Sequence, residues 1–129
     1  MTTELWLLFL SLPIYGLYLG AQSLIYRKDY GVMYAATARD EAKPESVMLG
    51  RAERALKNFQ ETWLSFVILI LTAYLAMPGD PVIFWGAIVY LAGRIVYLPL
   101  YLFGTFGIRS LVWNVATLGL AAMFFGVLF

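Results

Sequence analysis

Two arginines, an amide and a carboxylate recur at helical spacing in the segment 51–61, RAERALKNFQE. At 3.6 residues per turn, Arg51, Arg54, Asn58, Glu61 and the following Ser65 fall on one stripe of a helix. Guanidinium groups bind carboxylates through paired hydrogen bonds, and a carboxylate accepts an ammonium group. Together with the polar side chains that share its depth in the membrane, the stripe suits a small ligand that carries several negative charges and one amine, such as a flexible acidic peptide.

The stripe lies where the second hydrophobic segment of the chain begins. The strongly apolar part of that segment, 63–77, is shorter than the roughly 20 residues that cross a bilayer. The spanning helix must then include residues from about 55 onward, which brings Asn58 and Glu61 to the membrane edge. Polar groups at that depth are costly and indicate a functional site. A polar network that fixes helix packing or subunit register is the other interpretation.

The composition is that of an integral membrane protein. Of 129 residues, 62% are hydrophobic and 13% are charged, whereas soluble domains average about 45–50% and about 25%. The chain has neither cysteine nor histidine, which excludes disulfides, thiolate metal sites, a cysteine nucleophile and the commonest general base. We expect no bound metal. A net charge of +1 without a basic block gives no indication of nucleic-acid binding.

Hydrophobic segments predict a single domain, 1–129, with membrane spans at about 5–26, 55–77, 82–103 and 111–129. Residues 27–46 are predicted to form a loop with at most a short turn. Ser46 is a suitable N-cap for a helix that starts near Val47, and residues 78–81 (PGDP) predict a tight turn. The predicted fold is an all-α, up-and-down bundle of four transmembrane helices.

The basic residues predict the orientation of this bundle. Seven of the nine lysines and arginines lie between Arg27 and Lys57, and Arg109 lies between the third and fourth spans. The positive-inside rule places these segments in the cytoplasm and both termini on the other side. A bacterial inner membrane fits this short chain, which has no basic tail. The same topology brings further polar side chains to the depth of the 51–61 stripe: Arg27, Tyr97, Tyr101, Arg109 and Ser110.

Each of these side chains also has an ordinary structural interpretation. Arg27 and Arg109 suit interfacial anchors, and the tyrosines suit an aromatic stripe. Arg94, deeper in the third span, is expected to be mainly structural and to pair with Glu61 or another acid. The loop charges Asp40, Glu41, Lys43 and Glu45 are expected to be solvated.

Two motifs resemble those of the MAPEG family, the membrane-associated proteins of eicosanoid and glutathione metabolism. The first is R-x-x-R-A-x-x-N-x-x-E, from Arg51 to Glu61. The second is Arg94-x-x-Tyr97-x-x-x-Tyr101 followed by Arg109-Ser110. Length, four spans and a long first loop also agree, so the resemblance covers nearly the whole chain.

The resemblance implies a homotrimer with glutathione, the cosubstrate, bound between neighbouring subunits. By position, Arg54, Asn58 and Glu61 would hold the polar ends of glutathione, and Tyr97 and Tyr101 would line the same crevice. Arg27 would reach in from a neighbour, and Arg51 would supply a further basic group of less defined role. Arg109 would stabilise the thiolate, with Ser110 as a hydroxyl donor beside it.

Three functions are compatible with a polar site in a four-span membrane protein. The first is a glutathione-dependent transferase or peroxidase whose lipophilic small-molecule substrate arrives through the membrane lipids. The second is a non-enzymatic protein of the same fold that binds a lipid or other anion in the crevice. The third, a small four-span transporter, is disfavoured because the first span carries no carboxylate beyond Glu4 at its very start.

Overall fold

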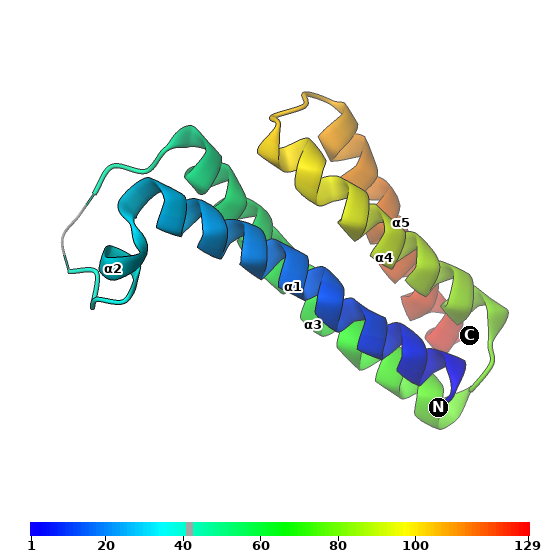
Figure 1. Ribbon diagram of the computed structural model, residues 1–129. Coiled ribbons are helices and arrows are strands. Elements are labelled where there is room, and N and C mark those ends of the chain that lie inside the picture. The colour runs from blue at the N-terminus through cyan, green and yellow to red at the C-terminus, as the bar shows by residue number, and fades with distance from the viewer. Residues whose placement is uncertain (41–42) are drawn as a thin grey trace.

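The computed structural model describes residues 1–40 and 43–129, and its long helices form an antiparallel bundle (Figure 1). Four helices are long and apolar enough to cross a membrane. The prediction of an all-α, four-helix membrane fold is confirmed. In chain order, the helices of the described residues are α1 (Thr3–Tyr30), the short α2 (Val32–Ala35), α3 (Val47–Ala76), α4 (Pro81–Leu102) and α5 (Ile108–Leu128).

The helix ends are set by local capping groups. Ser46 Oγ accepts a hydrogen bond from the Leu49 amide at 3.1 Å, so Ser46 is the N-cap of α3 as predicted. Asp80 caps α4 by accepting from the amide of Ile83, with Pro81 at the first helical position. Between α3 and α4, Gly79 has φ +83°, which a glycine adopts without strain. This short turn makes α3 and α4 antiparallel neighbours.

The prediction of a loop over residues 27–46 is wrong at its start. The helix α1 continues through Arg27 to Tyr30, and α2 follows directly. Side chains hold the returning chain against this extension: Tyr30 donates to the Pro44 carbonyl at 2.8 Å, and the Lys43 ammonium lies 3.8 Å from the Tyr34 ring centre. Aromatic and cationic side chains at the end of α1 therefore favour continued helix. Asp40, Lys43 and Glu45 are exposed, and Glu41 lies outside the described residues.

The helices are arranged as two pairs, α1 with α3 and α4 with α5 (Figure 1). Between α4 and α5 the backbones approach at glycines: a Cβ placed on Gly119 would lie 2.6 Å from the Gly86 carbonyl oxygen. Small residues commonly allow this close approach in membranes. Between α1 and α3, aromatic rings stack instead, with Tyr15 and Trp63 4.9 Å apart and Tyr18 and Phe59 4.7 Å apart.

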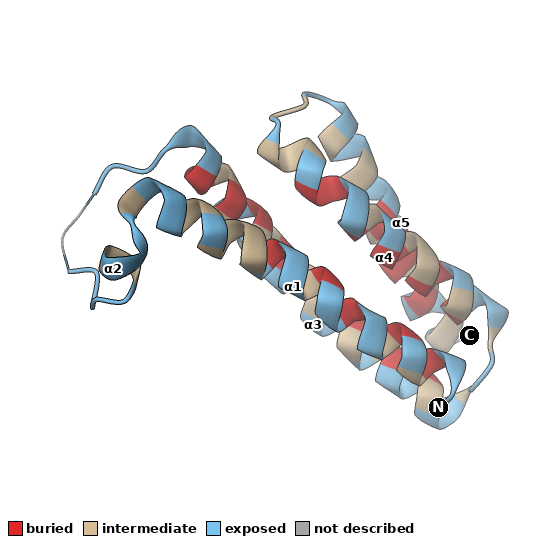
Figure 2. Ribbon diagram, in the orientation of Figure 1, coloured by how far each residue is buried: buried red, intermediate tan, exposed pale blue. Residues whose placement is uncertain are grey.

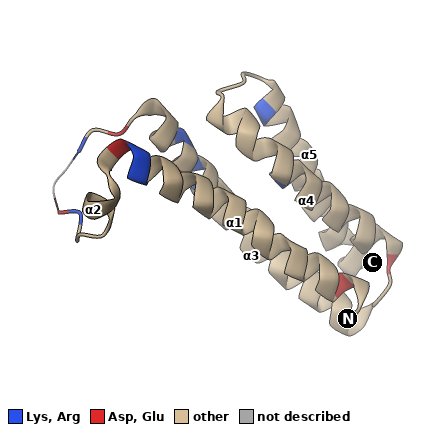
Figure 3. Ribbon diagram, viewed as in Figure 1, with Lys and Arg blue, Asp and Glu red and all other residues tan. Residues whose placement is uncertain are grey.

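Burial and charge show how the bundle relates to a membrane. Buried residues follow the inward faces of the long helices, and the outward faces are exposed (Figure 2) although many of their side chains are large and apolar, such as Leu75 and Trp85. Both termini lie at one end of the molecule, and most lysines and arginines lie away from that end (Figure 3). The outward faces are thus suited to an apolar environment, and the cationic side chains to one membrane surface.

Candidate functional site

A polar pocket of about 470 Å³ lies where α3, α4 and α5 meet, in the half of the bundle away from the termini. The helices contribute to it in register: α3 supplies four side chains at helical spacing, α4 supplies two tyrosines one turn apart, and α5 supplies its first two turns. The lining residues are Arg54, Lys57, Asn58, Glu61, Tyr97, Tyr101, Arg109, Ser110, Trp113 and Asn114.

The pocket brings together all of the predicted site residues except Arg27 and Arg51. The α3 stripe faces the C-terminal part of α4 because the tight turn at 78–81 makes these helices antiparallel. The short connection between α4 and α5 then returns Arg109 and Ser110 to the same depth as Tyr101. The site residues that the topology predicts to share one membrane depth therefore lie together within a single subunit.

Arg51 connects two elements next to the pocket and is not among its lining residues. Its Nη1 donates to the Leu102 carbonyl oxygen at 3.1 Å, at the end of α4. Its guanidinium also lies against Gly104, where φ is +66° and an added Cβ would be 2.7 Å from Arg51 Nη2. Arg51 thereby joins the start of α3 to the connection between α4 and α5.

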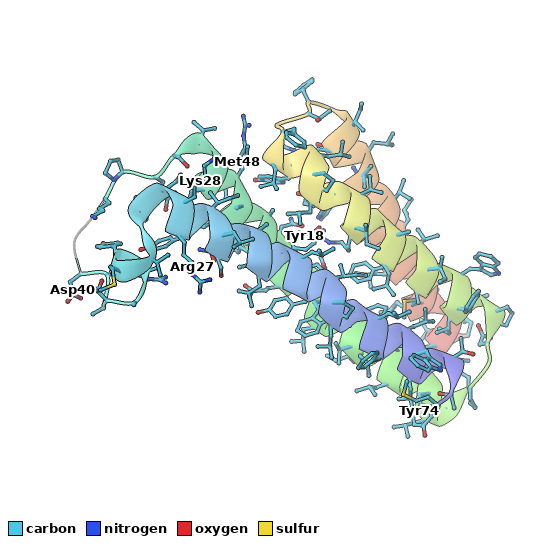
Figure 4. All side chains as sticks on the ribbon, in the orientation of Figure 1. Tyr18, Arg27, Lys28, Asp40, Met48 and Tyr74 are labelled. Carbon is cyan, nitrogen blue, oxygen red and sulfur yellow. The ribbon has the colours of Figure 1, made fainter. Side chains whose placement is uncertain are left out.

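Arg27 is exposed on α1 and lies apart from the pocket. Figure 4 shows its side chain projecting on the side of α1 that faces away from α4 and α5. Among the described residues it has no hydrogen-bond or ion-pair partner. In a single subunit, Arg27 therefore does not contribute to the site.

Tyr101 contacts two guanidinium groups of the pocket. Its hydroxyl accepts a hydrogen bond from Arg54 Nε at 3.3 Å, and the Arg109 guanidinium carbon is 4.7 Å from its ring centre. Tyr97 packs edge-on against the same ring at 5.5 Å. The hydrogen bond to the hydroxyl group and the cation–π attraction to the ring thus connect both arginines to one aromatic side chain. Tyr101 thus organises the cationic wall.

Arg94 is buried beneath the pocket, with 1% of its surface exposed. Its Nη1 donates to Asn58 Oδ1 at 2.8 Å, and its guanidinium lies 4.6 Å from the Tyr97 ring centre and 5.4 Å from that of Tyr18. Tyr18, seen between the helix pairs in Figure 4, donates its hydroxyl proton to the Arg94 carbonyl at 2.6 Å.

The expected pairing of Arg94 with Glu61 or another acid is absent from residues 1–40 and 43–129. An amide and three aromatic rings surround the guanidinium instead, and its Nε and Nη2 have no hydrogen-bond acceptor there. Because Arg94 occupies Asn58 Oδ1, the amide nitrogen of Asn58 remains as a donor at the pocket wall.

Three lining residues were not predicted: Lys57, Trp113 and Asn114. Lys57 follows Arg54 by three residues and precedes Glu61 by four, so helical spacing contains the signal for it. Asn114 follows Ser110 by one turn and donates to the Ser110 carbonyl at 2.8 Å. Trp113 places an indole nitrogen in the wall that is buried without an acceptor among the described residues.

The lining of the pocket carries an excess of positive charge. Its lining has three cationic side chains, Arg54, Lys57 and Arg109, and one carboxylate, Glu61. Among the described residues, Lys57 and Glu61 have neither an ion pair nor a hydrogen bond. The arrangement is suited to a ligand that carries several anionic groups and one cationic group, with hydroxyl and amide donors beside them.

Comparison with known proteins agrees with this arrangement. The model of the MAPEG family matches residues 5–129, which is almost the whole chain and includes every lining residue of the pocket. No curated protein and no solved structure gave a significant match. A four-helix membrane bundle with this polar pocket, matched over that length by a single family model, belongs to the MAPEG family.

Proposed function

We propose that this protein is a glutathione-dependent membrane transferase or peroxidase acting on lipophilic electrophiles. The observation that carries the proposal is the pocket wall, in which three cations, one carboxylate and several neutral donors converge. Membership of the MAPEG family supports a glutathione-transferase-like or related role.

The charged groups of glutathione match those of the wall. Glutathione carries two carboxylates, one ammonium and a thiol, and Arg54 is placed to bind a carboxylate through its guanidinium fork. Glu61, which has no partner among the described residues, accepts the ammonium. The hydroxyl groups of Tyr97 and Tyr101 and the free amide nitrogen of Asn58 supply neutral donors to the peptide.

The reaction requires a thiolate, and Arg109 is the group assigned to stabilise it. A free thiol has a pKa of about 8.5, and a guanidinium within about 4–6 Å lowers such a pKa by roughly 1–3 units. In conjugation, the thiolate attacks an electrophilic carbon, a C–S bond forms and the leaving group departs with its electron pair. Ser110, next to Arg109, donates a hydrogen bond to the thiolate. No histidine or cysteine of the protein is needed.

In the peroxidase reaction the same thiolate attacks a peroxide oxygen, and the O–O bond breaks. The alcohol departs after it takes a proton, and the sulfenic acid left on glutathione reacts with a second glutathione. That step gives the disulfide and water. Both reactions thus begin from the same bound thiolate.

The proposed assembly is a homotrimer with its copies in contact along α3. This helix exposes apolar side chains at steps of four, three and four residues: Leu64, Ile68, Leu71 and Leu75. That spacing is typical of a seam between packed helices. Arg27, exposed on α1, would then belong to the site of a neighbouring subunit. Light scattering in detergent measures the assembly, and Ile68→Asp is expected to dissociate it; a wild-type monomer would contradict the proposal.

We place the protein in a bacterial inner membrane with both termini on the non-cytoplasmic side. The support is the distribution of lysines and arginines at the end of the bundle opposite the termini. In intact cells, an impermeant thiol reagent is expected to modify a cysteine introduced next to Thr2, on the non-cytoplasmic side. It is not expected to modify a cysteine introduced at Gly107, on the cytoplasmic side.

An alternative function is non-enzymatic binding of a lipid head group or another anion. The same three cations suit a phosphate, and the surrounding helix faces suit acyl chains. Lipid that copurifies with the protein, together with no thiol-dependent turnover of any electrophile, would favour this alternative.

Glutathione binding by calorimetry distinguishes the two functions. The detergent-purified wild type is expected to bind saturably, and Arg54→Ala is expected to lose that binding. Arg39→Ala, which changes an arginine outside the pocket, is the matched control and should bind as the wild type does. No binding up to millimolar glutathione would reject the thiol-dependent function.

A further inference from the structure

A continuous apolar groove runs along α4 and α5. It consists of two cavities of about 470 Å³ and 370 Å³ that meet at Val89 and Val115, because these two residues line both. The groove involves residues 81–96 of α4 and 111–122 of α5, and every lining residue is glycine, alanine, proline, valine, leucine or tryptophan. No step of the proposed reaction uses this part of the molecule.

The close approach of the two helices produces the groove. A Cβ placed on Gly86, Gly93 or Gly119 would lie 2.6–2.8 Å from an atom of the facing helix, so these glycines form the floor. Trp85 and Leu118 line the groove but are 63% and 66% exposed, so they form its edges. Because α4 and α5 are both long and apolar enough to cross a membrane, the groove is open to hydrocarbon rather than to water.

The groove and the polar pocket lie on opposite sides of α5. Ser110 and Trp113 line the pocket, whereas Val115 and Ala122 line the groove, and at 3.6 residues per turn these two pairs point about 160° apart. The helix therefore separates the groove from a thiolate bound at Arg109, so the groove does not hold the electrophile during the reaction. The proposed contact between copies along α3 does not cover the groove, because α3 contributes no lining residue to it.

The dimensions of the groove fit hydrocarbon chains. Residues 81–96 extend about 22 Å along α4, which is longer than the roughly 15 Å that one leaflet contributes to the hydrocarbon core. Divided by that length, the volume of the groove corresponds to a cross-section of about 40 Å². A helix about 10 Å in diameter occupies about 80 Å² and can only rest on the edges. Hydrocarbon chains are about 4–5 Å wide, as contact distances between carbon atoms require, and two of them fit side by side.

We propose that the groove binds the two acyl chains of one phospholipid from the leaflet on the side of the termini. The helix α4 begins at the end of the molecule where both termini lie (Figure 1), and the exposed indole of Trp85, in its second turn, suits the depth of the lipid head groups. From there the chains follow the groove toward Val96. A lipid held between two helices has more van der Waals contacts with the protein than a lipid on a convex helix surface, and it exchanges more slowly.

A photoactivatable lipid tests the location of this site. The protein is reconstituted in vesicles of phosphatidylethanolamine and phosphatidylglycerol with a trace of phospholipid whose acyl chain carries a diazirine, and the residues that react are mapped by mass spectrometry. We expect adducts on the groove residues to exceed those on Leu17 of α1 and Ile95 of α4 by roughly tenfold, although these side chains are 54% and 47% exposed. An even distribution over all exposed apolar side chains, as ordinary surrounding lipid would give, overturns the inference.

Substitutions that fill the groove provide the second part of the test. Val115→Trp occupies the point where the two cavities meet and should reduce the groove adducts to the level found at Leu17. The matched control Leu17→Trp adds the same ring on α1 and should leave the groove adducts unchanged. Ala92→Phe, at an exposed position of the groove, should give the same loss and replaces Val115→Trp if that variant does not fold.

Thermal unfolding identifies the folded variants, and light scattering measures their assembly. Unchanged groove adducts in a folded Val115→Trp overturn the inference. A changed assembly mass in that variant also overturns it, because another copy of the chain would then occupy the groove. No outcome involves glutathione, so the inference and the proposed function fail independently.

Discussion

Arg94 Nη1 lies 2.8 Å from Asn58 Oδ1 and joins a buried cation in α4 to the pocket wall on α3. Aromatic rings enclose the guanidinium. Among the described residues, its Nη1 donates this hydrogen bond, whereas its Nε and Nη2 have no acceptor. An isolated charge in such a place is very unfavourable, so the amide oxygen and the aromatic faces stabilise it jointly. This interaction therefore joins α3 to α4 beneath the pocket, in addition to the hydrogen bonds from Arg51 to the Leu102 carbonyl and from Arg54 to Tyr101.

Replacing Asn58 by leucine is expected to destabilise the fold. The change removes the acceptor of Arg94, and a hydrogen bond to a charged group contributes about 1.5–3 kcal/mol. Thermal unfolding in detergent measures the effect. Asn58→Asp keeps an acceptor and should be much less destabilising. The control is Asn114→Leu, because the Asn114 amide donates to the Ser110 carbonyl of its own helix. Equal stability of Asn58→Leu and the wild type would show that Arg94 does not need this bond.

Helical spacing was sufficient to predict most of the pocket from the sequence. The positions of Arg54, Asn58 and Glu61 repeat with the helix period, and the short turn at 78–81 determines which part of α4 they face. Lys57 is related to Arg54 and Glu61 by the same helical spacing, but neither of the two family motifs includes it. The wall that Lys57 shares is formed by α3, α4 and α5 together, and the local sequence does not specify how these helices pack.

Two residues show where pattern reasoning is insufficient. Arg51 shares the stripe of Arg54, yet one turn nearer the helix start it meets the Leu102 carbonyl and Gly104 rather than the pocket. Arg94 was expected to pair with an acid because a buried charge usually has a counter-ion. The rings of Tyr18, Phe59 and Tyr97 supply that stabilisation, and a convergence of rings from three helices is a tertiary property.

Substitution at Gly119 is expected to separate α4 from α5. An added Cβ would lie 2.6 Å from the Gly86 carbonyl oxygen and 2.9 Å from the Tyr90 amide nitrogen, so the backbones must move apart. We expect Gly119→Ala to lower stability by about 1–3 kcal/mol, the usual cost of overpacking. Thermal unfolding checks this. Gly16→Ala is the matched control because no atom lies within 4 Å of its Cβ position, and it should be neutral or stabilising. Equal effects at both glycines would contradict the role of close packing.

Tyr101 is expected to act on glutathione binding through both its ring and its hydroxyl. Tyr101→Phe removes the bond to Arg54 but keeps the ring beside Arg109. The expected loss is about 0.5–1.5 kcal/mol of binding free energy, the net value of one hydrogen bond. Tyr101→Leu removes both contacts and should weaken binding further. Calorimetry of the two variants separates these contributions, and identical affinities would exclude a role for the ring.

Arg109→Ala is expected to impair the chemical step while the assembly remains intact. Without the guanidinium, the pKa of the bound thiol returns toward about 8.5, so at neutral pH the thiolate fraction falls by roughly tenfold or more. Because the thiolate still forms at high pH, activity of the variant should recover as pH rises through that value, whereas the wild type should already be on its plateau. A pH–rate profile with an electrophile in excess measures the shift.

The conservative change Arg109→Lys keeps a positive charge and should give an intermediate profile, which separates loss of charge from loss of structure. Light scattering on the same samples should show an unchanged assembly, because Arg109 contacts the Tyr101 ring within its own subunit. A variant that retains full activity at neutral pH would remove Arg109 from thiolate stabilisation. That result would leave Lys57 and Arg54 as the remaining cations of the pocket wall able to act on the sulfur.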